Sequence, residues 1–174
     1  MAYQKLQGSE GLNVIKSDDA RIPDPSTVVV LDTATQATVG VAAFTANTLT
    51  DVGTNFTGAG INVGAIIYNT TAGVAYTVTG VTSDTVLAIS PATAGGATDS
   101  YTIYNNATIG CLLFVGGTGN VEVQMAARNG NQATAAQPSN QTLTFNNVAD
   151  GSFLPLQVVR VAAATTATDI IAIW

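Results

Sequence analysis

The acidic residues and a single cysteine are the side chains that could do chemistry in this chain, which contains no histidine. Histidine is the usual general base and a common zinc ligand, so its absence argues against serine or cysteine triads and most zinc sites. Asp18 and Asp19 are adjacent acids, but they lie in a polar segment typical of a solvated loop. Glu122 alternates with apolar neighbours, which predicts a surface position on a strand. We therefore predict no catalytic residue, no metal ligand and no cofactor, and we do not expect an enzyme.

Three further segments superficially match reactive or ligand-binding sites. VGGTGN, at residues 115–120, looks like a phosphate-binding loop, but a strand rather than a helix follows it, so we expect a hairpin turn in which glycine supplies positive φ angles. Asp150-Gly151 has the chemistry of a turn, and a calcium loop would need several spaced acids. Cys111, within CLLFV, is expected to be a buried thiol rather than a nucleophile.

Composition indicates which partners the chain can have. The chain has 174 residues, of which 47% are hydrophobic and 9% charged, and its formal net charge is -6. No Lys or Arg occurs between Arg21 and Arg128, so binding to nucleic acid is not expected. The apolar runs are far shorter than the roughly 20 residues that span a bilayer, and the amino terminus does not resemble a secretory signal, so no membrane partner is expected. A surface with so few charges indicates extensive contact with other chains.

Short β-branched runs between Gly, Asn, Asp and Pro predict an all-β fold. We predict an N-terminal arm at 1–24, a discontinuous antiparallel β-sandwich of jelly-roll type at 25–44 and 106–174, and an inserted small β-barrel-like module at 45–105. Two consecutive sheets without interleaving remain the alternative. Within the sandwich, TIGCLLFVGGTGNVEVQM predicts a hairpin.

The carboxyl terminus is apolar on both faces of its predicted strand. A strand with no polar face is typical of burial between packed sheets or subunits, where each large side chain contributes about 1.5–3 kcal/mol. Deletion of residues 170–174 is therefore expected to abolish soluble assembly. The residues predicted to form an oligomer interface are Ile170, Ile171, Ile173, Trp174 and Arg160.

Arg160 is the charged member of this predicted interface. It lies in the apolar run LQVVRVAAA, where a guanidinium group is costly to bury unless it is paired. It is expected either at an edge with its head group in water, or beside a fixed partner. That partner would be Asp150, Asp169 or a carbonyl group across a subunit boundary.

The run LLFVGGTGNVEVQMA, followed after a loop by LTFNNVADGSFLPLQVVRVAAATTATDIIAIW, resembles a family of small virion proteins from tailed phages and gene transfer agents. These are described as head spike base or capsid decoration proteins, and the resemblance covers roughly residues 109–174. SDDARIPDP is similar to the acidic, proline-containing start of the family, whereas 45–105 departs from the family and resembles a β insertion found in phage structural proteins. The resemblance implies a β-sandwich that forms a symmetric ring on the capsid, without catalytic residues.

The expected function is that of a capsid decoration or cement protein, assembled in the host cytoplasm and located on the capsid surface of the virion. Its partners would be copies of itself, as a trimer first and a pentamer at vertices second, and the major capsid protein. It would stabilise contacts between capsomers or form a spike platform. The alternative is a host-attachment or carbohydrate-binding module of a spike or tail fibre, which predicts exposed aromatic clusters, although aromatic residues make up only 6% of the chain. An enzyme, such as a polysaccharide lyase or hydrolase fragment, is the third class of function.

Overall fold

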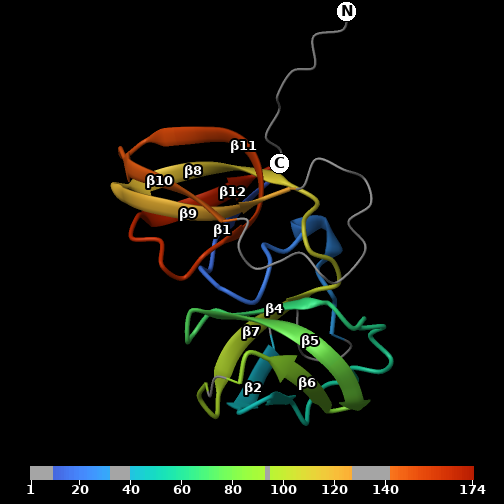
Figure 1. Cartoon of the computed structure of the whole chain (residues 1–174). Helices are drawn as coiled ribbons and strands as arrows, with labels where there is room; N and C mark the ends of the chain where they lie inside the picture. Colours follow the sequence, from blue (N-terminus) through green and yellow to red (C-terminus); the bar gives the residue numbers. More distant parts are fainter. Residues whose placement is uncertain (1–9, 32–39, 93–94, 127–141) are drawn as a thin grey trace, which may run out of the picture. The chain divides into compact units, whose positions relative to one another are not determined.

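The computed structural model describes residues 10–31, 40–92, 95–126 and 142–174 (Figure 1). The contacts divide the chain into two compact units, here called unit 1 (Met1–Val14 with Ile109–Trp174) and unit 2 (Ile15–Thr108). Unit 1 is discontinuous in sequence, and unit 2 is inserted into it. The predicted all-β, sandwich-like fold is confirmed, since the described residues form antiparallel strands and one short 3-10 turn at Pro25–Thr27.

Unit 1 contains a six-stranded antiparallel sheet with the strand order β1-β12-β8-β11-β9-β10. Its strands are β1 (Gly11–Asn13), β8 (Cys111–Gly117), β9 (Gly119–Met125), β10 (Thr142–Val148), β11 (Ser152–Val161) and β12 (Thr168–Ile173). The apolar carboxyl terminus forms β12, which lies between β1 and β8. Val14 donates its backbone N–H to Ile170 at 2.9 Å, and Trp174 donates its own to Glu10 at 3.2 Å. The end of the chain is therefore held in the interior of the sheet.

The prediction that β8 and β9 form a hairpin is wrong. These strands are separated by Thr118 alone, yet they do not pair with each other, because β11 lies between them in the sheet. The amino-terminal part of β11 pairs with β8, with Leu154 opposite Leu113, and its carboxyl-terminal part pairs with β9, with Val161 opposite Val123. Bulges near Val158 allow β11 to change partners along its length.

The glycines at the end of β8 and the start of β9 permit close packing rather than a left-handed turn. None of them is among the residues with positive φ. A Cβ atom on Gly116 would lie 2.8 Å from Cβ of Asp169, and one on Gly119 would lie 2.6 Å from Cα of Ala167. The start of β12 and the residue before it therefore pack directly on this backbone, and a side chain would push them away.

Unit 2 is a closed barrel with the order β2-β3-β6-β5-β4-β7. Its strands are β2 (Gly40–Thr45), β3 (Thr48–Thr50), β4 (Ile66–Asn69), β5 (Val74–Ser83), β6 (Val86–Ser90) and β7 (Asp99–Tyr104). Alternate residues of β6 and β7 point into the interior, as the half-buried pattern of each strand requires. The buried residues of the barrel form one apolar cluster: Val29, Leu31, Phe44, Leu49, Phe56, Ile61, Ala65, Ile67, Tyr76, Val78, Leu87, Ile89, Tyr101 and Ile103.

The unit boundaries differ from those predicted at 1–24, 25–44 and 45–105. Val29 and Leu31 belong to the barrel core, and Val29 donates its backbone N–H to Ile103 at 2.8 Å. β2 pairs with β3 and β7, so it also belongs to the barrel. Part of the predicted arm, β1, is a strand of unit 1. The predicted start of the barrel module at residue 45 is too late, because apolar residues from the preceding part of the chain also pack into the barrel core.

Candidate functional site

β8 and β12 have apolar residues on both of their faces. Side chains at alternate positions of these strands are buried on one face: Cys111, Leu113, Val115, Ile170 and Ala172. The intervening residues point to the opposite face, where they are only partly buried. There Ile171 lies opposite Phe114 and Ile173 lies opposite Leu112. Directly opposed residues of antiparallel strands are neighbours, so four large apolar side chains come together.

Phe153 of β11 extends this group across a third strand. It lies opposite Phe114 in the register of β8 and β11, and the two ring centroids are 5.1 Å apart with an interplanar angle of 58°. Phe153 is 63% exposed, which is unusual for a large aromatic side chain. We call the set Leu112, Phe114, Phe153, Ile171 and Ile173 the outer apolar face.

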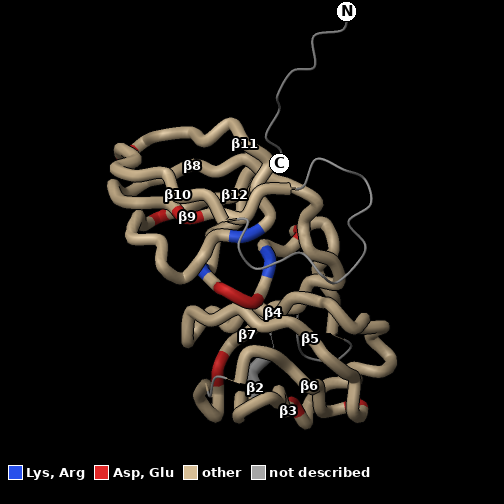
Figure 2. Tube along the Cα trace, viewed as in Figure 1, with Lys and Arg blue, Asp and Glu red and all other residues tan. Residues whose placement is uncertain are grey.

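The outer apolar face contains no charged residue. Of its three strands, β8 has no charged residue, β11 contains only Arg160, and β12 contains only Asp169. The tube of the sheet in Figure 2 accordingly shows long stretches without blue or red. Asp169 is exposed, two residues before Ile171, and has a φ of 51°, so it borders the apolar group. A group of this kind, with a polar border, is typical of a protein contact surface.

The structure brings together some of the predicted interface residues and separates others. Ile171 and Ile173 lie on the outer apolar face, whereas Ile170 is 4% exposed on the opposite, buried face. Trp174 follows β12 and is partly buried. Arg160 is also partly buried and lies opposite Gln124 of β9, away from the pairing of β8 with β12.

Sequence reasoning missed Leu112, Phe114 and Phe153. Alternation within CLLFV already indicates that Leu112 and Phe114 share one face of a strand. The register that places Phe153 and Ile171 on either side of Phe114 depends on long-range pairing, which the sequence does not specify. The outer apolar face is therefore identified by the strand pairing in the structure.

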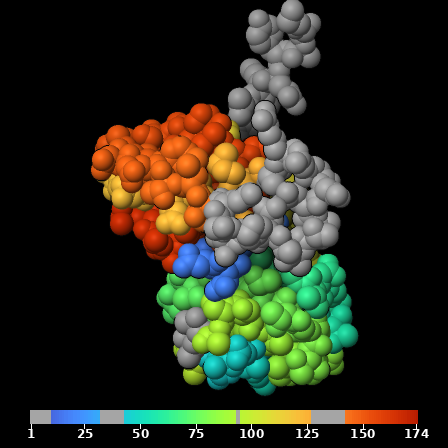
Figure 3. Space-filling model, in the orientation of Figure 1, coloured from blue at the N-terminus to red at the C-terminus, as the bar shows by residue number. Residues whose placement is uncertain are grey.

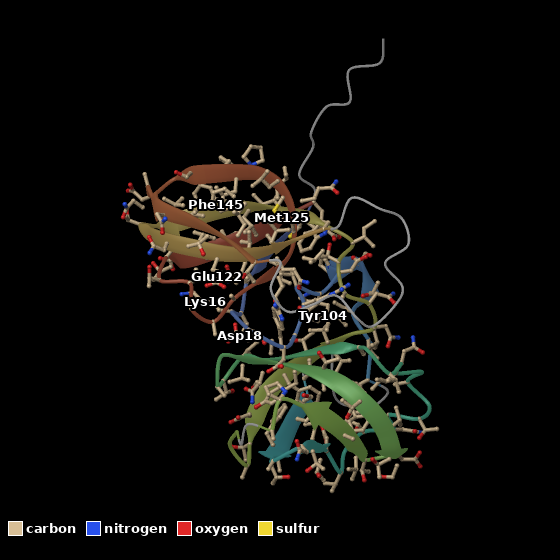
Figure 4. The ribbon with its side chains drawn as sticks, in the orientation of Figure 1. Lys16, Asp18, Tyr104, Glu122, Met125 and Phe145 are labelled. Atoms are coloured by element: carbon tan, nitrogen blue, oxygen red, sulfur yellow. The ribbon has the colours of Figure 1, made fainter. Side chains whose placement is uncertain are left out.

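In β9 and β10, apolar side chains point to the buried face of the sheet and polar side chains point to the other face. Val121 and Val123 of β9 are fully buried, as predicted, and Leu143 and Phe145 of β10 lie opposite them. Glu122 is partly buried and lies opposite Thr144 on the other face of these strands. Figure 4 labels Glu122 and Phe145 on this sheet, and Figure 3 shows the surface that the orange segment, β10 and β11, forms on the side in view.

The single cysteine is unsuited to nucleophilic chemistry. Cys111 is buried, and its thiol donates a hydrogen bond to the carbonyl oxygen of Val158 at 3.3 Å. Burial raises the pKa of this thiol to about 12, so the reactive thiolate form is scarce at neutral pH. Cys111 is a core residue of the sheet, as the sequence predicted.

Two buried carboxylates in the barrel have hydrogen-bonding partners. Tyr101 donates its hydroxyl proton to Asp51 at 2.7 Å, and Gly53 donates its backbone N–H to the same carboxylate at 2.9 Å. Burial, and then the neighbouring Asp51, raise the pKa of Tyr101, so the hydroxyl remains a donor. Since these groups satisfy each other, Asp51 anchors the turn after β3 rather than presenting a reactive acid.

Asp99 at the start of β7 has a similar environment. Its carboxylate accepts hydrogen bonds from Asn69 Nδ2 at 2.8 Å and from the backbone N–H of Gly96 at 2.6 Å. These two hydrogen bonds lower the pKa of Asp99 below its ordinary value, against a smaller opposing effect of burial. Across the described part of the chain, no group of three His, Cys, Asp or Glu side chains could hold a metal ion.

The two loop-like motifs have structural roles. Residues 115–120 end β8 and begin β9, with their glycines packed against the segment before β12. Asp150 is exposed in the turn before β11, and Gly151, at φ 71°, donates its N–H to the carbonyl of Val115 at 2.8 Å. The turn predicted at Asp150-Gly151 is confirmed.

Comparisons with protein-family models, characterised proteins and solved structures find no match to this chain. Within the described residues, no helix has the length and apolar character needed to cross a membrane. The outer apolar face is therefore the candidate functional site, on the strength of its composition and exposure.

Proposed function

We propose that this chain is a virion structural protein of the capsid decoration or cement type. It binds the outer surface of a capsid as a symmetric homo-oligomer, stabilising contacts between capsomers or forming the platform of a spike. The proposal assigns contact surfaces and no catalytic residue. Its partners are further copies of the chain and the major capsid protein.

The outer apolar face is the observation that carries the proposal. Phe153 is 63% exposed on a sheet whose neighbouring strands add Phe114, Ile171 and further apolar side chains. Exposed apolar area is costly in water, and covering it contributes about 25 cal/mol per Å². A second chain that covers this face removes that cost without needing any charged partner. The resemblance of residues 109–174 to head spike base and decoration proteins supports the same reading.

Symmetric assembly explains how a small chain with few charged residues could bind firmly to a capsid. Copies that use one patch repeatedly around an axis form a closed ring, and the ring presents several equivalent binding points at once. Several weak contacts then act together, because each one raises the effective concentration of the next. We expect a trimer, with a pentamer as the second candidate.

The test measures the mass of the purified full chain in solution and its binding to capsids. Particles that lack the chain are mixed with the wild type, with Phe153→Ser, and with Val63→Ser, a control in the barrel that also changes an exposed apolar residue. We expect oligomers and bound particles for the wild type and the control, and a lower mass without binding to particles for Phe153→Ser. A monomeric wild type without affinity for capsids would overturn the proposal, and specific binding to immobilised glycans would support an attachment module instead.

A further inference from the structure

We propose that β10 pairs with β10 of a second copy of this chain, antiparallel and centred on Thr144. The sheet of unit 1 ends at β1 and β10, whereas the barrel of unit 2 is closed and has no edge. β10 pairs with β9 on one side only. Among the described residues, none forms a backbone hydrogen bond to the other side of β10. Asn147 donates its N–H to Oδ1 of Asn120 at 3.0 Å, and Asn120 belongs to β9, the strand that β10 already pairs with.

Up to the irregularity between Phe145 and Val148, the edge of β10 has no lysine, proline or bulge that would prevent strands from associating. Natural edge strands are blunted by lysine, proline, an early bulge or very short length. The stretch Thr142–Phe145 contains no charged residue and no proline, and its register with β9 is regular up to Phe145. Leu143 is 49% exposed, and Thr144 is exposed beside it. The row of N–H and C=O groups that no described residue pairs with therefore fits an extended strand.

The sequence of β10 identifies that strand as β10 itself. In an antiparallel pair centred on Thr144, that residue faces the partner's Thr144. Leu143 then faces the partner's Phe145, and Thr142 faces the partner's Asn146. Over Thr142–Asn146, apolar side chains meet apolar ones and polar side chains meet polar ones, which is the pattern that stabilises cross-strand pairs. Because the strand is uncharged, two copies can approach despite the net charge of -6 on each chain.

This contact is distinct from the outer apolar face. Leu143 and Phe145 lie opposite Val123 and Val121, whose side chains are on the buried face of the sheet. Phe153 and Ile171 project from the other face, two and four strands away from β10 in the sheet order. The inference does not depend on the proposed function, and each contact can be removed without changing the residues of the other.

Disulfide crosslinking of the full chain tests the register. Thr144→Cys places two thiols directly opposite each other, whereas Leu143→Cys places them one diagonal apart, beyond the reach of a disulfide. Cys111 does not interfere, since it is buried with a raised pKa. Under mild oxidation we expect Thr144→Cys to form a covalent dimer at least about tenfold faster than Leu143→Cys. Equal rates for the two variants, or no dimer from Thr144→Cys, would overturn the proposal.

Charge substitutions test the same contact without oxidation. Thr144→Lys places two positive charges opposite each other, so we expect the dissociation constant of the β10 contact to rise about fivefold or more. An equimolar mixture of Thr144→Lys with Thr144→Glu should restore association, because opposite charges then face each other. Thr79→Lys, at an exposed position of β5, is the matched control and should associate like the wild type.

Sedimentation equilibrium of the full chain separates the two contacts. If Phe153→Ser abolishes all association while Thr144→Lys behaves like the wild type, the pairing of β10 is overturned and the outer apolar face is supported. If Thr144→Lys lowers the mass and Phe153→Ser does not, β10 pairing is supported and the proposed function loses its main surface. A wild type that is monomeric at all concentrations overturns both.

Discussion

Phe114 and Phe153 lie opposite each other on β8 and β11, with ring centroids 5.1 Å apart, and Phe153 remains 63% exposed. Tilted aromatic pairs of this separation are favourable beyond the area that they bury, so Phe114 holds Phe153 in place at the surface. The protein therefore maintains an ordered, exposed aromatic side chain among aliphatic neighbours. Such a residue is typical of the centre of an interface.

Replacing Phe153 with serine should weaken self-association without unfolding unit 1. The side chain is mostly in water in a single copy, so its loss removes little buried area there, whereas in an assembly it would be covered. We expect the dissociation constant to rise about tenfold or more, the range for residues at the centre of an interface. The melting temperature, measured at a concentration where the chain is monomeric, should change little. A large fall in that temperature would show that Phe153 acts mainly in folding.

Ile170 and Ile171 are adjacent in β12 but should respond oppositely to truncation. Ile170 is 4% exposed on the buried face, so Ile170→Ala should lower the free energy of unfolding by about 2–4 kcal/mol through lost burial and a cavity. Ile171 lies on the outer apolar face opposite Phe114, so Ile171→Ala should act mainly on solution mass. Urea unfolding and sedimentation of both variants check this contrast. Equal effects on unfolding would mean that both faces of β12 are covered within one copy.

The sequence predicted the type of structure better than its connections. β-branched runs between turn residues indicated strands throughout, and alternation in NVEVQM placed Val121 and Val123 on the buried face. These features are local, because a strand's two faces are set by a period of two residues. The turn at Asp150-Gly151 was likewise predictable, since Gly151 adopts a φ of 71°.

The errors arose where partners distant in sequence decide the outcome. VGGTGN has the composition of a hairpin turn, yet β11 inserts between β8 and β9 and the glycines serve close packing. The predicted interface residues came from the apolar carboxyl terminus and from Arg160, so Ile170 was included although it points inward, and Phe153 was missed. Neither the register of β11 nor its bulges leave a local signal in the sequence.

Gly119→Ala should destabilise unit 1. A Cβ atom at this position would lie 2.6 Å from Cα of Ala167, which is backbone and cannot rotate away. Overpacking of this kind costs about 1–3 kcal/mol in the free energy of unfolding. Gly80→Ala is the matched control, because its new Cβ would lie 3.7 Å from Cβ of Ala88, an ordinary contact. Urea unfolding compares the two, and an unchanged Gly119→Ala would refute the close-packing role of the glycine.

Tyr101→Phe should destabilise the barrel of unit 2. The hydroxyl group donates to the buried carboxylate of Asp51 at 2.7 Å, and its removal leaves that charge with one fewer donor in a site that is 7% exposed. A buried group deprived of its partner costs about 1–3 kcal/mol. Tyr104→Phe is the control, because that hydroxyl has no hydrogen bond to the described part of the chain. Thermal unfolding followed by near-ultraviolet circular dichroism measures both, and equal losses would contradict the role of the Asp51 bond.

Asp99 should make the stability of the barrel depend on pH in the acid range. Its hydrogen bonds from Asn69 and from Gly96 lower its pKa in the folded state below the ordinary value. A carboxyl group with a lowered folded pKa contributes stability that is fully present above its unfolded pKa of about 3.9, and this contribution is lost as the pH falls through the folded pKa. Asp99→Asn lacks the charge at every pH. The wild type should therefore be more stable than Asp99→Asn at pH 7, and the difference should shrink as the pH falls below about 4. Urea unfolding of both proteins across that range measures the difference directly. A gap that stays constant with pH would show that Asp99 contributes through shape and neutral hydrogen bonds rather than through its charge.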